Sequence, residues 1–128
     1  MAVSNYQDLI VWKKSMDLAK EVYSIVKLLP KEELYALSDQ IRRSVVSIPS
    51  NIAEGCGRES IPQMCNFLRI AKGSAAELET QLLLCRNIGY LNDESIKGPL
   101  TLLNEISKMI RSLMHKEQSF VFNKVNKS

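Results

Sequence analysis

Few side chains in this chain of 128 residues could carry acid–base or nucleophilic chemistry. His115 is the single histidine, so any Ser–His or Cys–His pair depends on it alone. We expect His115, which is followed by Lys116, to lie on the surface near the C-terminal end of a helix, where the helix dipole favours a cation. The sequence therefore predicts no catalytic residue.

The sequence also lacks the motifs of metal and cofactor sites. A di-iron bundle uses Glu-x-x-His on two helices, and neither that motif nor a Gly-rich phosphate loop occurs. Glu77 and Glu79 are two residues apart and point to different helix faces, so we expect them to be solvated or ion-paired. Cys56, Cys65 and Cys85 show no C-x-x-C spacing and are typical of small core residues in a reducing cytoplasm. We predict no metal and no cofactor.

Basic residues at a helical repeat are the best candidates for binding. Lys13, Lys20 and Lys27 recur every seven residues and so line one stripe of a helix. The further nucleic-acid-binding candidates are Arg42, Arg43, Arg69 and Lys72. The alternative is an ordinary solvated face of mixed charge, because acidic residues such as Asp17 and Glu21 lie close to the lysines.

The segment from Ser47 to Arg58 has the most distinctive polar pattern in the chain. Glu54 and Arg58 are four residues apart and can pair on a helix, and Gly55 permits a turn or a tight contact. We expect glycine in a left-handed conformation to end a helix around Gly55 to Gly57. The residues of this motif are Asn51, Glu54, Gly55 and Arg58. A structural role is our prediction, and contact with a ligand is the alternative.

Four amphipathic helices are expected to position these residues. Apolar side chains recur at spacings of three and four, and the repeats are interrupted at Pro30, Ser60 and Gly89. The expected helices span about 7–29, 33–55, 61–88 and 93–116, and a C-terminal tail with a frayed end follows at 117–128. Since no strand-like alternation occurs, we predict an all-α domain over residues 1–116, folded as an up-down-up-down antiparallel four-helix bundle.

The first expected helix carries more apolar surface than one helix seam needs. Two apolar stripes, one with Trp12 and Tyr23 and the other with Val22 and Ile25, together cover about 180° of its circumference. A stripe somewhat over about 100° wide is enough for one core, so the wider arc predicts packing on two sides. We therefore expect a homo-oligomer, with Val22 and Ile25 as oligomer-interface candidates.

Composition limits the possible classes of function. A hydrophobic content of 45% with 24% charged residues is typical of a globular chain rather than a disordered one. The net charge of +3 is weaker than that of a dedicated nucleic-acid binder. The sequence contains neither a signal-peptide hydrophobic region nor a run of 18 apolar residues, so we expect a cytoplasmic protein without a membrane partner.

Several motifs together resemble one known family. The stretches Ser47-Ile-Pro-Ser-Asn-Ile-Ala-Glu-Gly55 with Arg58, and Phe67-Leu-Arg-Ile-Ala-Lys-Gly-Ser74, are similar to the four-helix-bundle proteins encoded in intervening sequences inside bacterial 23S ribosomal RNA genes. The resemblance implies a four-helix bundle without an established enzymatic activity. A related branch, the accessory proteins of diversity-generating retroelements, forms homopentamers that bind nucleic acid and a reverse transcriptase, so the resemblance also implies a pentamer.

Two functions follow as expectations. The first is a non-catalytic homo-oligomer that binds RNA or DNA weakly and without sequence preference, because lysine stripes repeated in a ring could neutralise several phosphates at once. The alternative is an oligomeric scaffold that binds a protein partner and no nucleic acid. Salt-dependent retention of RNA distinguishes the two.

Overall fold

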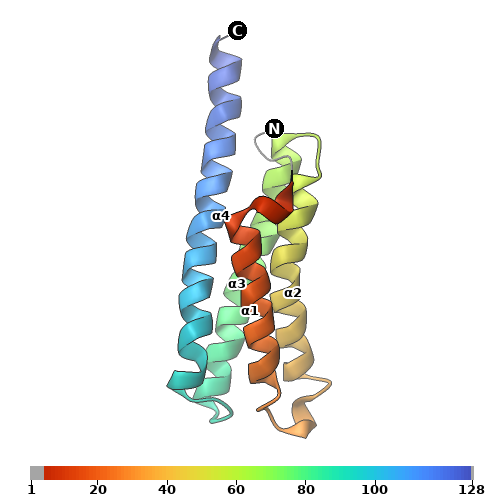
Figure 1. Cartoon of the computed structure of the whole chain (residues 1–128), viewed down its shortest axis with the longest axis vertical. Coiled ribbons are helices and arrows are strands. Elements are labelled where there is room, and N and C mark those ends of the chain that lie inside the picture. The colour runs from red at the N-terminus through yellow and green to blue at the C-terminus, as the bar shows by residue number, and fades with distance from the viewer. Residues whose placement is uncertain (1–4, 128) are drawn as a thin grey trace.

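Four α-helices make up most of the chain. The computed structural model describes the backbone of residues 5–127 and the side chains of residues 5–116, and within that range it contains no strand. The elements are η1 (Tyr6–Asp8), α1 (Ile10–Val26), η2 (Lys31–Glu33), α2 (Leu37–Cys56), α3 (Ile61–Asn87) and α4 (Asp93–Lys127). Figure 1 shows consecutive α-helices running in opposite directions, so the prediction of an all-α four-helix bundle is confirmed.

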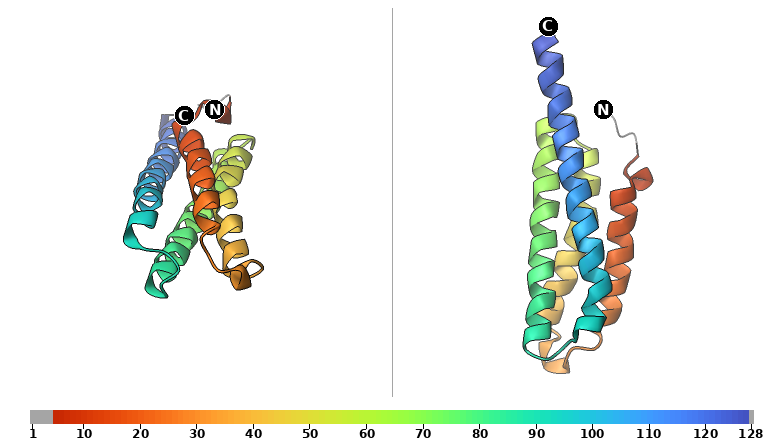
Figure 2. Two further views of the ribbon diagram at one scale, coloured as in Figure 1. Left: turned by 60° about the horizontal axis from the view of Figure 1, so that its bottom comes forward. Right: turned by 90° about the vertical axis from the view of Figure 1, so that its left-hand side faces the viewer.

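The four α-helices occupy the corners of a square. α1 packs against α2 and α4, and α3 packs against the same two helices, whereas α1 and α3 are not neighbours in the described part of the chain. The two views in Figure 2 show the four helices lying along one another. Surfaces on the outer faces of α1 and α3 are therefore separated by the width of the bundle.

Capping residues explain where α3 begins and ends. Ser60 Oγ accepts a hydrogen bond from the backbone N–H of Gln63 at 3.2 Å, as its capping-box spacing predicts. Pro62 lies in the first turn, where its missing N–H has no intrahelical partner to lose. At the other end, Gly89 has a φ of 87°, a left-handed conformation that a β-carbon would strain, and it turns the chain toward α4.

α1 and α2 are both shorter than predicted. α1 ends at Val26, because the turn before Pro30 tightens and the Leu29 N–H donates to the Val26 carbonyl at 3.1 Å. α2 begins at Leu37, whose N–H donates to the Glu33 Oε2 atom at 3.2 Å. This carboxylate satisfies one of the backbone donors that a helix start leaves unpaired.

Gly55 allows α2 and α3 to approach closely. The prediction of a left-handed glycine at the end of α2 is wrong, because Gly57 has a φ of −85° and Gly89 is the residue with positive φ in the described chain. A β-carbon at Gly55 would lie 3.0 Å from the Met64 carbonyl oxygen and 3.2 Å from the Phe67 Cβ atom. The glycine is therefore needed for helix contact rather than for a turn.

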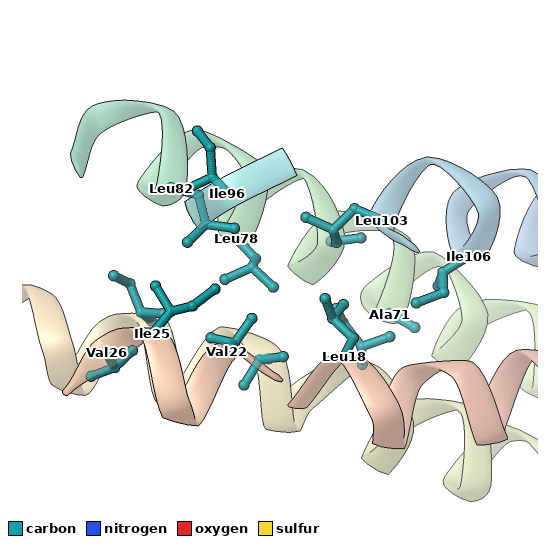
Figure 3. Close-up of a cluster of buried hydrophobic side chains, with 14 of the residues drawn as sticks. Leu18, Val22, Ile25, Val26, Ala71, Leu78, Leu82, Ile96, Leu103 and Ile106 are labelled. Carbon is teal, nitrogen blue, oxygen red and sulfur yellow. The ribbon is translucent and has the colours of Figure 1, made fainter. Parts of the chain in front are cut away.

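Side chains from all four α-helices build the hydrophobic core. Its largest fully buried members are Leu18, Ile41, Ile48, Ile52, Met64, Leu68, Leu78, Leu82, Ile96, Leu103, Ile106 and Ile110. Figure 3 shows Val22 and Ile25 of α1 in this cluster together with Leu78 and Leu82 of α3. Val22 is 0% and Ile25 8% exposed, which corrects their prediction as oligomer-interface residues. Their stripe faces the core of the same protomer. The other apolar stripe of α1 is only partly covered, because Trp12 and Ala19 pack against the edge of the core whereas Met16 and Tyr23 are exposed.

α4 continues past its predicted end at residue 116. Its backbone is helical to Lys127, and Figure 1 shows its last turns projecting beyond the ends of the other helices. The predicted separate tail at 117–128 is therefore corrected: residues 117–127 belong to α4, and residue 128 lies outside the described chain. No Gly or Pro follows Pro99, so the sequence contains no helix breaker at the predicted boundary.

Candidate nucleic-acid interface

The lysine stripe, Lys13, Lys20 and Lys27, is exposed on the outer face of the α1 segment. Lys13 and Lys20 lie within α1, and Lys27 follows directly after it. No ion pair within the described chain involves any of the three. The carboxylate of Glu21 is turned away from the stripe toward α4, where it would contact a β-carbon placed on Gly98. The three ammonium groups are therefore available to an external anion.

The arginines of α2 have intramolecular partners. Arg42 is half-buried, and its Nη2 atom donates to the Leu34 carbonyl at 3.2 Å. The Arg43 Nε atom donates to Asp39 Oδ2 at 3.0 Å, one helical turn earlier. Binding a phosphate would compete with these interactions, so both arginines are weaker candidates than the sequence indicates.

The basic candidates of α3 lie on a different part of the molecule from the lysine stripe. The Arg69 Nη1 atom donates to Asn66 Oδ1 at 2.7 Å, a neutral partner that leaves the charge of Arg69 uncompensated. Lys72 is exposed and takes part in no ion pair among the described residues. Because α3 lies diagonally across the bundle from α1, the seven predicted residues do not form one surface.

A hydrogen-bonded seam connects α2 to α3 next to the predicted motif. The Ser47 and Ser74 hydroxyls are 2.7 Å apart across the helix interface. Asn51 Nδ2 donates to the Ser47 carbonyl at 2.8 Å and to Ser47 Oγ at 2.9 Å. Small side chains let the helices approach, and these hydrogen bonds fix their register.

Glu77 extends this seam toward the other end of the bundle. It accepts hydrogen bonds at Oε1 from Ser44 Oγ at 3.1 Å and from Gln81 Nε2 at 3.3 Å. Glu77 is exposed, which fits the predicted solvated group, and two neutral donors from α2 and α3 also hold its carboxylate. Gln81 is buried, and its Oε1 atom has no hydrogen-bond partner in the described part of the chain.

Glu54 and Arg58 form the ion pair that their spacing predicts. Arg58 Nη2 lies 2.7 Å from Glu54 Oε2, and the Arg58 guanidinium also lies 4.5 Å from the centroid of the Phe67 ring. The surface hollow at this end of α2 measures about 550 Å³ and is lined by Ser50, Ala53, Glu54, Gly57 and Arg58. The two charges in this hollow satisfy each other, an arrangement that supports a structural role.

His115 is not near a helix end, because α4 continues to Lys127. It is exposed and lines a hollow of about 490 Å³ between α3 and α4, together with Lys72, Arg111, Ser112 and Met114. The sequence analysis did not identify Arg111 as a second basic residue beside Lys72. The two residues line one hollow only because α3 packs against α4. The spacing of Arg111 and His115, four residues apart on one helix face, was the available signal.

A second hollow of about 500 Å³ lies where the start of α1 meets α4. It is lined by Asp8, Leu9, Ile10, Val11, Lys108, Met109, Ser112, Leu113 and Lys116. Apolar side chains form most of its wall, and its charged residues are one acid, Asp8, and two bases, Lys108 and Lys116. It offers an apolar surface rather than a set of converging reactive groups.

The described residues do not assemble a metal centre or a membrane span. No group of three or more His, Cys, Asp or Glu side chains within the described chain could hold a metal ion. No described helix combines the length and the apolar character that crossing a bilayer requires. What these residues present is a helical bundle with exposed basic groups on two separate faces.

Fold and surface together define an all-α four-helix-bundle protein with a polar α2–α3 seam. The family model described as 23S rRNA-intervening sequence protein matches residues 7–112, so the chain belongs to this family. The resemblance inferred from the Ser47–Gly55 and Phe67–Ser74 stretches is therefore confirmed.

A solved relative has the same fold over most of this chain. It is the crystal structure of a protein with unknown function from the S23 ribosomal protein family of Bacteroides thetaiotaomicron. The two chains are 30% identical, with a TM-score of 0.76, and the similarity covers 82% of this chain and 98% of the relative. No curated protein matches this chain at a significant level.

Proposed function

We propose that this protein is a non-catalytic homo-oligomer that binds nucleic acid weakly and without sequence preference. The observation that carries the proposal is the lysine stripe, whose three exposed ammonium groups have no ion-pair partner among the described residues. The descriptions of the family and of the solved relative both refer to ribosomal components, which favours RNA as the polyanion. DNA carries the same phosphate chemistry and is the second candidate ligand.

Multivalency supplies the physical basis for binding. One protomer has a net charge of +3 and one stripe of three lysines, enough to neutralise only a few phosphates. Several protomers in one assembly present several stripes to the same long polyanion, so the later contacts are effectively intramolecular. Affinity should therefore fall steeply both with added salt and on dissociation of the assembly. Because contacts to phosphates carry no information about the bases, this binding should show no sequence preference.

The proposed oligomer interface is the apolar edge of α1, formed by Trp12, Met16, Ala19 and Tyr23. Met16 is 45% and Tyr23 43% exposed, and Trp12 and Ala19 are half-buried beside them. The apolar edge lies next to the lysine stripe on the surface of α1. The helical repeat places the two sets of residues on adjacent lines along the helix. We propose that a second copy of the chain covers this edge, in the pentamer that the family resemblance implies.

The test is RNA retention by the wild-type oligomer and by the variant Lys13→Gln/Lys20→Gln/Lys27→Gln. At about 50 mM salt, where phosphate contacts are strong, the wild type should retain RNA, and the triple variant should bind all sequences more weakly with a smaller salt slope. For a matched control, Lys13→Gln/Lys20→Gln is compared with Lys31→Gln/Lys97→Gln, which removes the same charge from exposed positions elsewhere.

If wild-type protein retains neither RNA nor DNA under these conditions, the nucleic-acid proposal fails. The alternative is then an oligomeric scaffold that binds a protein partner. Exposed apolar side chains on α3 and at its C-terminal end favour that alternative: Ile70 is 51% and Leu84 46% exposed within α3, and Ile88, which follows α3, is 51% exposed.

A further inference from the structure

A second basic site lies at the junction of α3 and α4. We call it the α3–α4 hollow: about 490 Å³ lined by Lys72 of α3 and by Arg111, Ser112, Met114 and His115 of α4. Lys72, Arg111 and His115 are exposed, and none of the described side chains that line the hollow is a carboxylate. None of these three side chains is part of an ion pair or a side-chain hydrogen bond among the described residues.

Other basic groups that contact α4 have acidic partners. Lys14 Nζ lies 2.8 Å from Glu105 Oε2, an ion pair between α1 and α4. Arg86 Nη1 lies 3.5 Å from Asp93 Oδ1, an ion pair that connects the end of α3 to the start of α4. In the α3–α4 hollow, by contrast, like charges converge from two helices, and their mutual repulsion is unfavourable until an anion enters.

The charge of α4 changes along its length. Residues 93–105 contain one Lys or Arg against three Asp or Glu, whereas residues 106–127 contain five Lys or Arg against one Glu. The α3–α4 hollow lies within this basic half, and the helix then projects beyond the other three (Figure 1). A polyanionic chain bound in the hollow would therefore meet further positive charge along the same helix.

We propose that the α3–α4 hollow binds phosphodiester groups of a nucleic-acid chain, as a second contact surface separate from the lysine stripe. The inference rests on the proposed function and adds a location to it. Arg111 offers a planar fork that can donate two hydrogen bonds to one phosphate, and Lys72 adds a point charge from the opposite wall. The Ser112 hydroxyl and an imidazole N–H of His115 are further donors. Since most of the hollow is formed by α4, which packs against α1, one strand reaching both surfaces would cross α4.

His115 makes the test direct, because it is the single histidine and its ring signals in a proton NMR spectrum belong to one residue. At saturating concentrations, single-stranded RNA should shift these signals in the wild type and to the same extent in the variant Lys13→Gln/Lys20→Gln/Lys27→Gln, although the variant needs more RNA to reach saturation. The variant Lys72→Gln/Arg111→Gln should lower the magnitude of the salt slope by about 1.4, that is by about 0.7 for each lost single-strand phosphate contact. The control Lys31→Gln/Lys97→Gln removes equal charge and should lower the slope by less.

The outcomes separate this inference from the proposed function. If RNA binds but the two double variants behave alike and the His115 signals do not move, the hollow is not a binding site, and the proposed function stands. If inorganic tripolyphosphate shifts His115 as strongly as RNA at equal phosphate concentration, the hollow is a site for free polyphosphates and the nucleic-acid assignment is overturned. If the wild type binds no polynucleotide, both proposals fail. Melting temperatures of the variants, which change exposed side chains only, verify that each is folded.

Discussion

Glu33 connects the start of α2 to the loop before α4. Its Oε2 atom accepts the Leu37 N–H at 3.2 Å, and its Oε1 atom accepts the Tyr90 hydroxyl at 3.2 Å. Burial, followed by the Glu33 charge, raises the pKa of Tyr90 above its ordinary value of 10.0. Burial and the same carboxylate also raise the pKa of the Cys85 thiol above 9.0. Burial and the Glu33 carboxylate therefore both favour the protonated forms of Tyr90 and Cys85.

This arrangement predicts a loss of stability in alkali. The folded-state pKa of Tyr90 lies above the unfolded value, so its stabilising contribution is complete below about pH 10 and disappears as the pH rises through the folded-state pKa. In Tyr90→Phe, the free energy of unfolding should therefore fall less between pH 8 and pH 10.5 than in the wild type. Urea unfolding at the two pH values measures the difference. Equal falls in both proteins would contradict a role for Tyr90.

The Glu54–Arg58 pair predicts a small and purely structural effect. Both side chains are about half exposed, so Glu54→Gln should lower the free energy of unfolding by about 0.3–0.5 kcal/mol, the usual contribution of an i,i+4 pair. The exposed Glu59 has no ion-pair partner among the described residues, and Glu59→Gln controls for the change in net charge. The two variants should have the same affinity for RNA. A selective change of affinity in Glu54→Gln, with unaltered stability, would mean that the segment contacts a ligand.

At the scale of the helices, the close approach of α2 to α3 makes two glycines behave in opposite ways. A β-carbon at Gly55 would press on backbone at Met64, so Gly55→Ala should destabilise the protein by about 1–3 kcal/mol, as overpacking does. Gly73 is exposed within α3, with nothing within 4 Å of a β-carbon, so Gly73→Ala should stabilise by about 0.5–1 kcal/mol. Urea unfolding of both variants measures the contrast, and equal effects would refute the close contact at Gly55.

At the scale of the whole molecule, assembly is predicted to depend on the apolar edge of α1 and not on its core stripe. Met16→Glu/Tyr23→Glu should dissociate the oligomer to a particle of 14.5 kDa while the helical circular dichroism is kept. Val22→Asp should instead unfold the protomer, because it buries an unpaired charge at a cost of several kcal/mol. Light scattering and circular dichroism distinguish the two results.

A matched control uses exposed apolar residues on another helix. Ile70→Glu/Leu84→Glu changes side chains of α3 that are about as exposed as Met16 and Tyr23, and it should leave the assembly intact. Dissociation by the α3 variant alone would move the interface to the opposite side of the bundle. A wild-type particle of 14.5 kDa at micromolar concentrations would contradict the oligomer altogether.

The resemblance of the Ser47–Gly55 and Phe67–Ser74 stretches indicated the family. Residue spacing determined the four-helix architecture, the cap at Ser60 and the turn at Gly89. These features depend on neighbours within about one helical turn, or on periodicity that any helix must obey, so a linear sequence contains them. Three outcomes were decided only by the tertiary structure. The bundle selected which of the two apolar stripes of α1 became core, and it thereby buried Val22 and left Tyr23 exposed. The α2–α3 contact gave Gly55 its role, and the α3–α4 packing brought Lys72 next to Arg111. Each of the three depends on atoms that are distant in sequence, and periodicity shows that a face is buried without showing which partner covers it.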